Sequence, residues 1–163
     1  MENEKTFRTK TGFCHILSDK IILTRDGIIG NVAKITVGNG ISRILLIYST
    51  ISIFLLYSAY SSFQKGENVS VLFFGLLAIF LIYGIIKSIN NSATPIIERS
   101  KIKEAKFINA KVGLTRSRFE ILFEDENGKL KKRLIMLPGS LNDGTNETEK
   151  ALTIMKIEKI LAS

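Results

Sequence analysis

The sequence predicts an α+β protein: a small antiparallel sheet or partial barrel with a C-terminal helix, interrupted by an inserted two-helix transmembrane hairpin. Three observations predict this class. Two long runs of the 163-residue chain contain no charged residue, Ile44 to Gln64 and Asn68 to Ile86. Short segments of alternating apolar and polar residues, separated by turn-forming pairs, lie on both sides of these runs. The C-terminal residues carry apolar side chains at helical spacing.

Each uncharged run is long enough to cross a bilayer as a helix. A hydrocarbon core about 30 Å thick needs roughly 20 helical residues at about 1.5 Å each. A soluble helical hairpin is the alternative, but neither run shows the polar face that a helix of a small soluble domain carries. We therefore predict spans at about 44–64 and 69–88.

The basic residues near the spans predict their orientation. The linker Lys65-Gly66-Glu67-Asn68 is so short that the two helices must be antiparallel neighbours, and Gly66 can adopt the positive φ of a tight reversal. The ends of membrane spans that are flanked by basic residues stay on the cytoplasmic side. Lys65 is the only basic residue in the linker. The other nearby basic residues are Lys34, Arg43, Lys87, Arg99, Lys101 and Lys103. This pattern predicts a multi-pass protein of the cell (inner) membrane with both termini in the cytoplasm.

The remaining residues have the size of one small domain in two parts. Residues 1–42 form the first part of a cytoplasmic β domain with its lead-in, 43–89 the transmembrane hairpin, and 90–163 the second part. In the first part, "FCHILS" and "KIILTR" flank the turn-forming pair Ser18-Asp19 and predict a β-hairpin, and Asp26-Gly27 ends its second strand. Residues 28–42 fit a strand or an interfacial segment equally well.

The second part predicts three further strands. Pro95 ends any helical continuation, and "SKIKEAKFINAK" has the pattern of a strand. "SRFEILFED" and "KLKKRLIML" follow, joined by Asn127-Gly128, a strong hairpin signal because both positions of such a turn need positive φ. In the first of these strands, the apolar residues Phe119, Ile121 and Phe123 alternate with charged ones, which predicts one face on a core and one in water.

The C-terminus predicts an amphipathic helix over about 147–161. Asn146 is followed three residues later by Glu149, a spacing typical of a helix N-cap. The apolar residues that follow fall within roughly half of a helical wheel, enough to cover one end or face of a small sheet.

In this layout the chain resembles the bacterial pleckstrin-homology-like (PH-like) membrane proteins. The stretches that carry the resemblance are "GFCHILSDKIILTRDG", "SRFEILFEDENGKLKKRLIMLPGS" and "NETEKALTIMKIEKIL". The resemblance implies a strongly bent sheet or partial barrel, capped by a helix and tethered near the inner leaflet. The chain shows fewer clear strands than a full seven-stranded domain, so an incomplete barrel and a homodimer that completes it both stay open. Similar sequences sometimes carry the name of a purine-pathway ligase, phosphoribosylaminoimidazole-succinocarboxamide synthase, but no phosphate-gripping glycine motif supports that activity here.

The positive charge has two interpretations, a signal for topology and solubility or a contact with an anionic partner. The net charge is +8, and the segment just past the second span carries many Lys and Arg residues. Anionic lipid headgroups are the nearest partner, each nearby cation contributing about 1 kcal/mol, although the positive-inside bias explains part of the excess. Nucleic acid is disfavoured because no aromatic residues or binding motif accompany the charge. The candidate contact residues, for headgroups or a protein partner, are Lys101, Lys103, Lys106, Arg116 and Arg118.

The sequence shows no catalytic motif. A single cysteine, Cys14, and a single histidine, His15, exclude an internal disulfide and a zinc site of the usual composition. Neighbouring strand residues point to opposite faces, which argues against a Cys-His nucleophile pair. We therefore predict no cofactor, no metal and no enzyme.

The predicted function is a non-catalytic, membrane-anchored module that binds a protein segment or anionic headgroups at the inner membrane surface. A free sheet edge would suit an extended protein segment. The alternative is a small membrane-bound enzyme of lipid or nucleotide metabolism. Its candidate acids are Glu120, Glu124 and Asp125.

Overall fold

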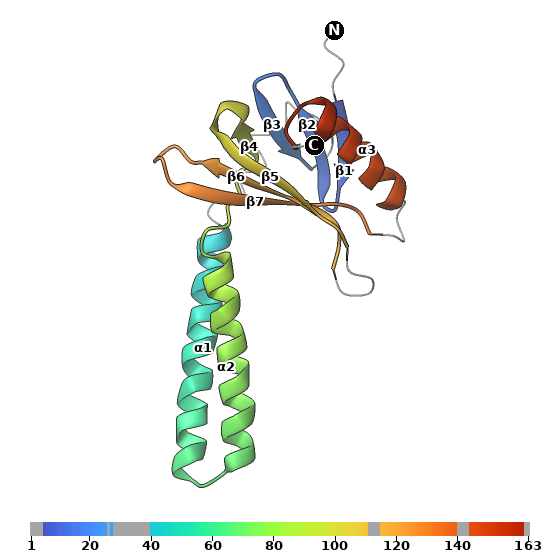
Figure 1. The fold of residues 1–163 in the computed structure, drawn as a ribbon. Helices are drawn as coiled ribbons and strands as arrows, with labels where there is room; N and C mark the ends of the chain where they lie inside the picture. The colour runs from blue at the N-terminus through green and yellow to red at the C-terminus, as the bar shows by residue number, and fades with distance from the viewer. Residues whose placement is uncertain (1–4, 26, 28–39, 111–114, 140–143, 162–163) are drawn as a thin grey trace. The chain divides into compact units, whose positions relative to one another are not determined.

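The structure, a computed structural model, describes residues 5–25, 27, 40–110, 115–139 and 144–161. The chain divides into two compact units, Met1–Gly38 with Ser92–Ser163, and Asn39–Asn91. Within the described residues lie two small antiparallel sheets and three α-helices, two of them apolar (Figure 1). The predicted α+β class is confirmed. We call the first unit the β domain and the second the helical hairpin.

The first sheet contains the predicted hairpin and two strands that the sequence pattern did not reveal. Its strands, in their order across the sheet, are β1 (Lys5–Thr9), β2 (Gly12–Ile16), β3 (Lys20–Thr24) and β4 (Ile96–Glu98). The β2–β3 turn is closed by a hydrogen bond from the Leu17 amide to the Lys20 carbonyl. Strand β1 contributes one fully buried residue, Phe7, among polar neighbours, so it lacks a recognisable alternation.

The second sheet agrees with the predicted strands. It consists of β5 (Ile102–Ile108), β6 (Arg118–Glu124) and β7 (Leu130–Met136), in that order. Along β6 the predicted alternation is confirmed, because Phe119, Ile121 and Phe123 are buried and the residues between them are not. A register irregularity between Ile102 and Glu104 interrupts the pairing of β5 with β6.

The β6–β7 hairpin lies where the sequence placed it, but its turn is of a different type. Gly128 has a φ of 71°, whereas Asn127 does not share a positive φ. The Gly128 amide donates to the Asp125 carbonyl, and the Asp125 side chain accepts from the amides of Asn127 and Lys129. The turn therefore has the pattern of a type I turn followed by one left-handed residue. In this turn the Asp125 carboxylate accepts the Asn127 and Lys129 amides, a role that the predicted Asn-Gly turn did not include.

Helix α3 (Gly144–Ile157) begins and ends earlier than predicted. Asn146 lies inside the first turn, so the predicted cap is wrong. Gly144 is buried so closely that a Cβ there would lie 2.5 Å from the Gly139 carbonyl oxygen, and this packing accompanies the earlier start. At the other end Lys159 has a φ of 54°. The Lys159 and Ile160 amides bond back to the Lys156 and Met155 carbonyls, which is a Schellman motif.

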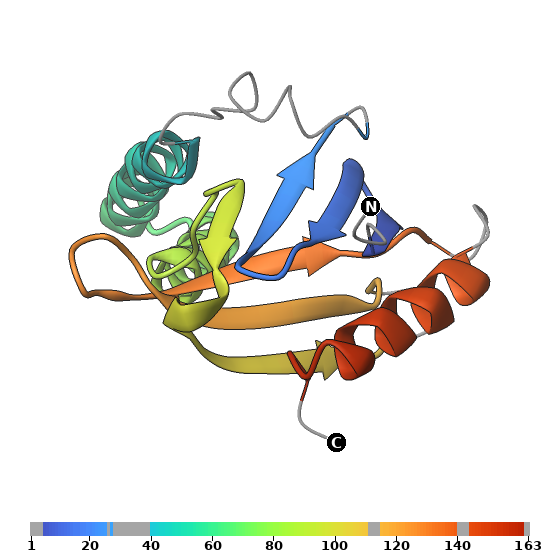
Figure 2. The same cartoon turned by 90° about the horizontal axis from the view of Figure 1, so that it is seen from above.

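The hydrophobic core of the β domain lies between the two sheets and α3. Figure 2 shows α3 running beside β1, and Ala151 and Met155 of α3 are fully buried in the same cluster as Phe7 and Phe119. The rings of Phe7 and Phe119 meet edge to face at 5.8 Å between centroids. One residue from each sheet thus forms the central contact of the core.

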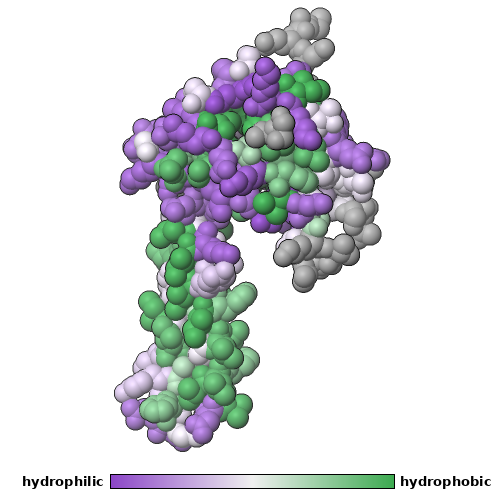
Figure 3. All heavy atoms as spheres, in the orientation of Figure 1, coloured by the Kyte–Doolittle hydropathy of each residue, from purple (hydrophilic) through white to green (hydrophobic). Residues whose placement is uncertain are grey.

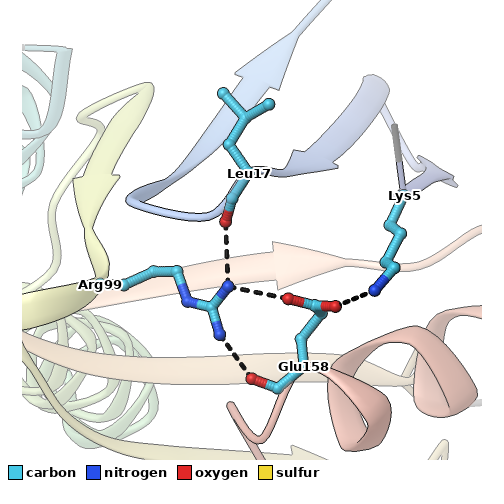
Figure 4. A network of polar contacts seen from close by, with 4 residues as sticks. All are labelled: Lys5, Leu17, Arg99 and Glu158. Atoms are coloured by element: carbon cyan, nitrogen blue, oxygen red, sulfur yellow. Dashed lines mark hydrogen bonds and ion pairs between the residues drawn. The ribbon is translucent and has the colours of Figure 1, made fainter. Parts of the chain in front are cut away.

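A polar network holds the end of α3 to the first sheet (Figure 4). The Glu158 carboxylate accepts from Lys5 of β1 and from Nη1 of Arg99, the latter at 2.8 Å. Arg99 belongs to a single 3₁₀ turn, η2 (Arg99–Lys101), and its Nη1 also donates to the Leu17 carbonyl at 3.0 Å. The network therefore ties together β1, the β2–β3 turn, η2 and the end of α3.

Strand β7 touches the first sheet's connections at two points along its free edge. The Lys132 carbonyl accepts from the Ser92 amide and the Met136 carbonyl from the Lys10 amide, both at 2.8 Å. Residues 133–135 lie between these two hydrogen bonds. This stretch borders the cavity described below.

The helical hairpin consists of α1 (Gly40–Gln64) and α2 (Asn68–Ser88), close to the predicted spans. Gly66 in the connection has a φ of 75°, as its predicted role requires. The buried residues Ser52, Ser62 and Ala78 are small, which allows close helix packing. Apolar residues cover the visible surface of the hairpin, and hydrophilic residues gather at its turn (Figure 3).

Candidate functional site

The predicted contact residues are largely paired with acids. Arg116 lies beside Gly139, where an added Cβ would be 3.2 Å from its Nη1. The other four form ion pairs: Lys101 with Glu98, Lys103 with Glu124, Lys106 with Glu104 and Arg118 with Glu120, at 2.9 to 3.2 Å. Spacing along the chain does not reveal the Lys103–Glu124 pair, because Glu124 reaches Lys103 from the neighbouring strand.

The three acids of the enzyme alternative also have partners of their own. Glu120 pairs with Arg118, and Glu124 with Lys103. Asp125 accepts backbone hydrogen bonds from Lys129 and Asn127, and these bonds, with the Lys129 amide first, hold the pKa of its carboxyl below the ordinary value. Each acid thus has a structural role on a strand or in a turn. Nothing in this geometry favours a catalytic role for them.

A cationic cavity lies between β7 and the first sheet. Its volume is about 530 Å³. It is lined by the β1–β2 turn (Thr9, Lys10, Thr11), the end of β3 (Leu23, Thr24, Arg25), Ala93, and residues Arg133, Leu134, Ile135 and Met136 of β7. The three charged residues of this lining are all basic, and the described residues that line the cavity include no carboxylate.

Arg133 is the most buried of the three cations. Its partner on β6 is the buried Ile121, and it lies two residues before the buried Ile135 on β7. Its side chain therefore lies on the core-facing side of β7. Its Nη1 donates to the Ser92 carbonyl at 2.9 Å. Its Nε is buried and has no hydrogen-bond partner among the described residues. Burial lowers the pKa of the guanidinium from its ordinary value.

The position of Arg133 does not follow from its neighbours in the sequence. The run "KLKKRLIML" contains three consecutive basic residues, a pattern typical of a solvated strand. Its pairing with β6, however, places Arg133 on the same face as the buried Ile135, and Lys132 on the opposite face. The available signal was the alternation of Arg133, Ile135 and Leu137, in which the last two are core residues.

Cys14 and His15 occupy opposite faces of β2, as predicted. Cys14 pairs with Phe7 and is buried in the core, where burial raises the pKa of its thiol. The His15 ring lies between two hydroxyls, with Nδ1 3.1 Å from Thr6 Oγ1 and Nε2 2.8 Å from Thr24 Oγ1. Both residues are integrated into the first sheet, and His15 links its three consecutive strands.

No protein family model matches the chain, and no curated protein sequence or solved structure matches it either. The geometry of the β domain and of the helical hairpin is therefore the basis for the function proposed next.

Proposed function

We propose that this chain is a non-catalytic membrane-anchored module. The helical hairpin crosses the membrane twice, both termini lie in the cytoplasm, and the β domain binds anionic lipid headgroups at the inner surface. The observation that carries the proposal is the apolar exterior of α1 and α2. In the most apolar window of each helix only 6% of the residues are buried, whereas a core helix of a soluble protein would be mostly buried.

The residues at the two ends of the hairpin support this orientation. The charges of Lys65 and Glu67 at the turn cancel. Arg43 near the start of α1 and Lys87 near the end of α2 both lie at the end of the hairpin away from the turn. An excess of basic residues at the ends away from the turn favours a cytoplasmic location for those ends. The Lys87 ammonium also lies 4.8 Å from the centroid of the Tyr83 ring. A Lys–Tyr pair of this kind suits a membrane interface.

The architecture of the β domain supports a PH-like fold. Among the described residues lie seven strands, where the sequence pattern showed fewer, four in one sheet and three in the other, and α3 packs on their shared core. Hydrogen bonds at two points of β7 connect it to loops of the first sheet, as they would in a partial barrel. On this basis we propose that the two sheets and α3 form the bent sheet or partial barrel with a C-terminal helix that the resemblance implies.

The ion pairs on β5 and η2 leave these cations available to lipid. The side chains of Lys101, Lys103 and Lys106 are 36%, 48% and 59% exposed. Exposed ion pairs contribute only about 0–1 kcal/mol, so a phosphate group can replace the carboxylate at little cost. Several such exchanges on one surface would give a weak, salt-sensitive contact with an anionic leaflet.

Cysteine labelling tests the topology. In intact cells, Glu67→Cys at the turn should react with a membrane-impermeant maleimide, and Ser100→Cys in the β domain should react only after the membrane is opened. The native Cys14 gives little background because it is fully buried. External labelling of Ser100→Cys would contradict the proposed orientation.

Lipid retention tests the headgroup contact. The full chain, purified in neutral detergent, should retain added phosphatidylglycerol more than phosphatidylcholine, and the difference should shrink as salt rises. Replacing Lys101, Lys103 and Lys106 by Gln should remove most of the difference. The matched change of Lys129, Lys131 and Lys132 should remove less. Equal retention of both lipids by the parent protein would instead favour docking of a protein segment or a second copy.

A further inference from the structure

The described residues that line the cavity beside Arg133 include three cations and no acid to balance them. Among the residues that the structure describes, Lys10, Arg25 and Arg133 border the same 530 Å³ space without a lining carboxylate. The cations on the outer face of the second sheet differ in this respect, because Lys106 and Arg118 each have an acid within 2.9 Å. Like charges around one cavity repel each other, so an anion there would be stabilising.

Arg133 has the chemistry of an incomplete anion site. Its guanidinium carries five N–H donors, and only the bond to the Ser92 carbonyl is made with a described residue. A buried donor without a partner costs roughly 1–3 kcal/mol, and a buried cation usually has an acid beside it. Within the described chain, the Arg133 Nε has no hydrogen-bond partner, and the cavity that Arg133 lines has no carboxylate.

Other donors border the same space. Thr9 and Thr11 line the cavity with hydroxyl groups. Alternate residues of a strand turn their backbone groups to the same edge. The Lys132 and Met136 carbonyls face the first sheet's connections, so the backbone of Leu134, midway between them, faces the same edge. The Leu134 amide is thereby turned toward the cavity that this residue lines.

We propose that this cavity binds the dianionic phosphate of a phosphate monoester, with Arg133 as the principal ligand and Lys10 and Arg25 as supporting cations. Three cations with hydroxyl and amide donors suit a doubly charged phosphate better than a singly charged carboxylate. The apolar part of the lining, Leu23, Ala93 and Ile135, provides space for the group that carries the phosphate. A soluble phosphate ester and a phosphomonoester lipid share this chemistry, and the experiment separates them.

This site is independent of the headgroup contact proposed above. The two use different residues, Lys101, Lys103 and Lys106 on one side and Lys10, Arg25 and Arg133 on the other. Soluble phosphate can therefore bind in the cavity whether or not the β5 surface touches lipid. Failure of either experiment leaves the other interpretable.

The test measures phosphate binding to the full chain in neutral detergent. The probes are inorganic phosphate, glycerol 3-phosphate and phosphatidic acid, each compared with chloride at the same ionic strength. Isothermal titration gives the affinity, and thermal unfolding gives the shift of the midpoint. Phosphate or its ester should raise the midpoint above that in chloride, more at pH 7.5 than at pH 5.5, because the second pKa of a phosphate monoester is about 6.

Three variants make the result specific. Arg133→Met, which keeps an apolar chain of similar length, should weaken phosphate binding about tenfold or more, corresponding to about 1.4 kcal/mol. Lys10→Gln with Arg25→Gln changes exposed residues only, so the protein should fold and bind phosphate several-fold more weakly. Lys132→Met, on the face of β7 opposite Arg133, is the matched control and should bind like the parent.

The outcomes separate the sources of the phosphate. Binding of inorganic phosphate or glycerol 3-phosphate supports a soluble ligand. A response to phosphatidic acid alone that Arg133→Met weakens supports a lipid headgroup in the same cavity. The proposal is overturned if no probe differs from chloride. It is also overturned if the double variant, or a folded Arg133→Met variant, binds phosphate as tightly as the parent.

Discussion

The Arg99 guanidinium donates hydrogen bonds to both the side chain and the backbone carbonyl of Glu158. Its Nη1 donates to the Glu158 carboxylate at 2.8 Å, and its Nη2 donates to the Glu158 backbone carbonyl at 2.5 Å. Glu158 directly follows the last residue of α3, so this carbonyl belongs to a helix end that lacks intrahelical donors. The same guanidinium thus neutralises a side chain and caps a helix, and it joins the two parts of the β domain that flank the helical hairpin in sequence.

The first prediction concerns the pH dependence of this network. Hydrogen bonds from Lys5 and Arg99 lower the pKa of the Glu158 carboxyl below its ordinary value of 4.5. The stability that the lowered pKa contributes is therefore fully present above about pH 4.5 and lost as the pH falls through the folded-state value. Glu158→Gln should destabilise the β domain by about 1–2 kcal/mol at pH 7 and by less at pH 3. Chemical denaturation of both proteins at the two pH values measures this, and an equal loss at both would contradict it.

The second prediction concerns the end of α3. Lys159 adopts a φ of 54°, in the left-handed region that glycine tolerates best, whereas α1 ends in the same hydrogen-bond pattern with Gly66 at the corresponding position. Lys159→Gly should therefore raise the free energy of unfolding by about 0.5–1 kcal/mol. Lys156→Gly, inside the last turn of α3, should lower it by about 1 kcal/mol. Equal effects of the two changes in thermal unfolding would show that the left-handed residue is misplaced.

The third prediction tests the close approach of two strands. A Cβ added at Gly12 would lie 1.9 Å from the Thr24 carbonyl oxygen, a distance that no relaxed side chain tolerates. Gly12→Ala should push β2 away from β3 and destabilise the β domain by about 2 kcal/mol or more. Thr11→Ala, at the neighbouring exposed position, should change the unfolding free energy by less than about 0.5 kcal/mol. If Gly12→Ala left the free energy of unfolding unchanged, the two strands would have to lie further apart.

The fourth prediction concerns the β6–β7 turn. Space around Gly128 is open, so only its φ of 71° restricts substitution there. Gly128→Val should destabilise the hairpin by about 1–2 kcal/mol, because a β-branched residue resists positive φ. Gly128→Asn should cost less, because asparagine visits the left-handed region more readily. If both variants were as stable as the parent, the turn would have to be assigned differently.

The fold was predictable where a local pattern is strong. The spans at 44–64 and 69–88 coincide closely with α1 and α2, because uninterrupted apolar runs and one glycine turn leave few alternatives. The β2–β3 and β6–β7 hairpins follow from turn residues between short apolar segments. Strands β1 and β4 were missed, since β4 has only 3 residues and β1 contributes only Phe7 to the fully buried core. Their strand conformation comes from pairing. Strand β1 pairs with β2, and β4 pairs with β3, which lies far from it in the sequence.

The candidate sites were less predictable than the elements. The sequence identified the basic segment that contains Lys101, Lys103 and Lys106, but the pairing of Lys103 with Glu124 depends on strand register and a strand irregularity. The helix cap at Asn146 was wrong because packing of Gly144 against Gly139 accompanies an earlier start of α3. Local capping preferences contribute about 1 kcal/mol, which tertiary packing readily exceeds.

By itself, the sequence determined the two apolar helices, the main hairpins and the positive charge of this protein, because each depends on neighbours within a few residues. Only the tertiary structure decided which cations are paired and which are enclosed. Lys132 and Arg133 are adjacent in the chain, yet Lys132 lies 3.8 Å from Glu120 while Arg133 turns toward the core. A one-residue step along a strand reverses the face, and which face becomes the interior depends on how the two sheets close around the core.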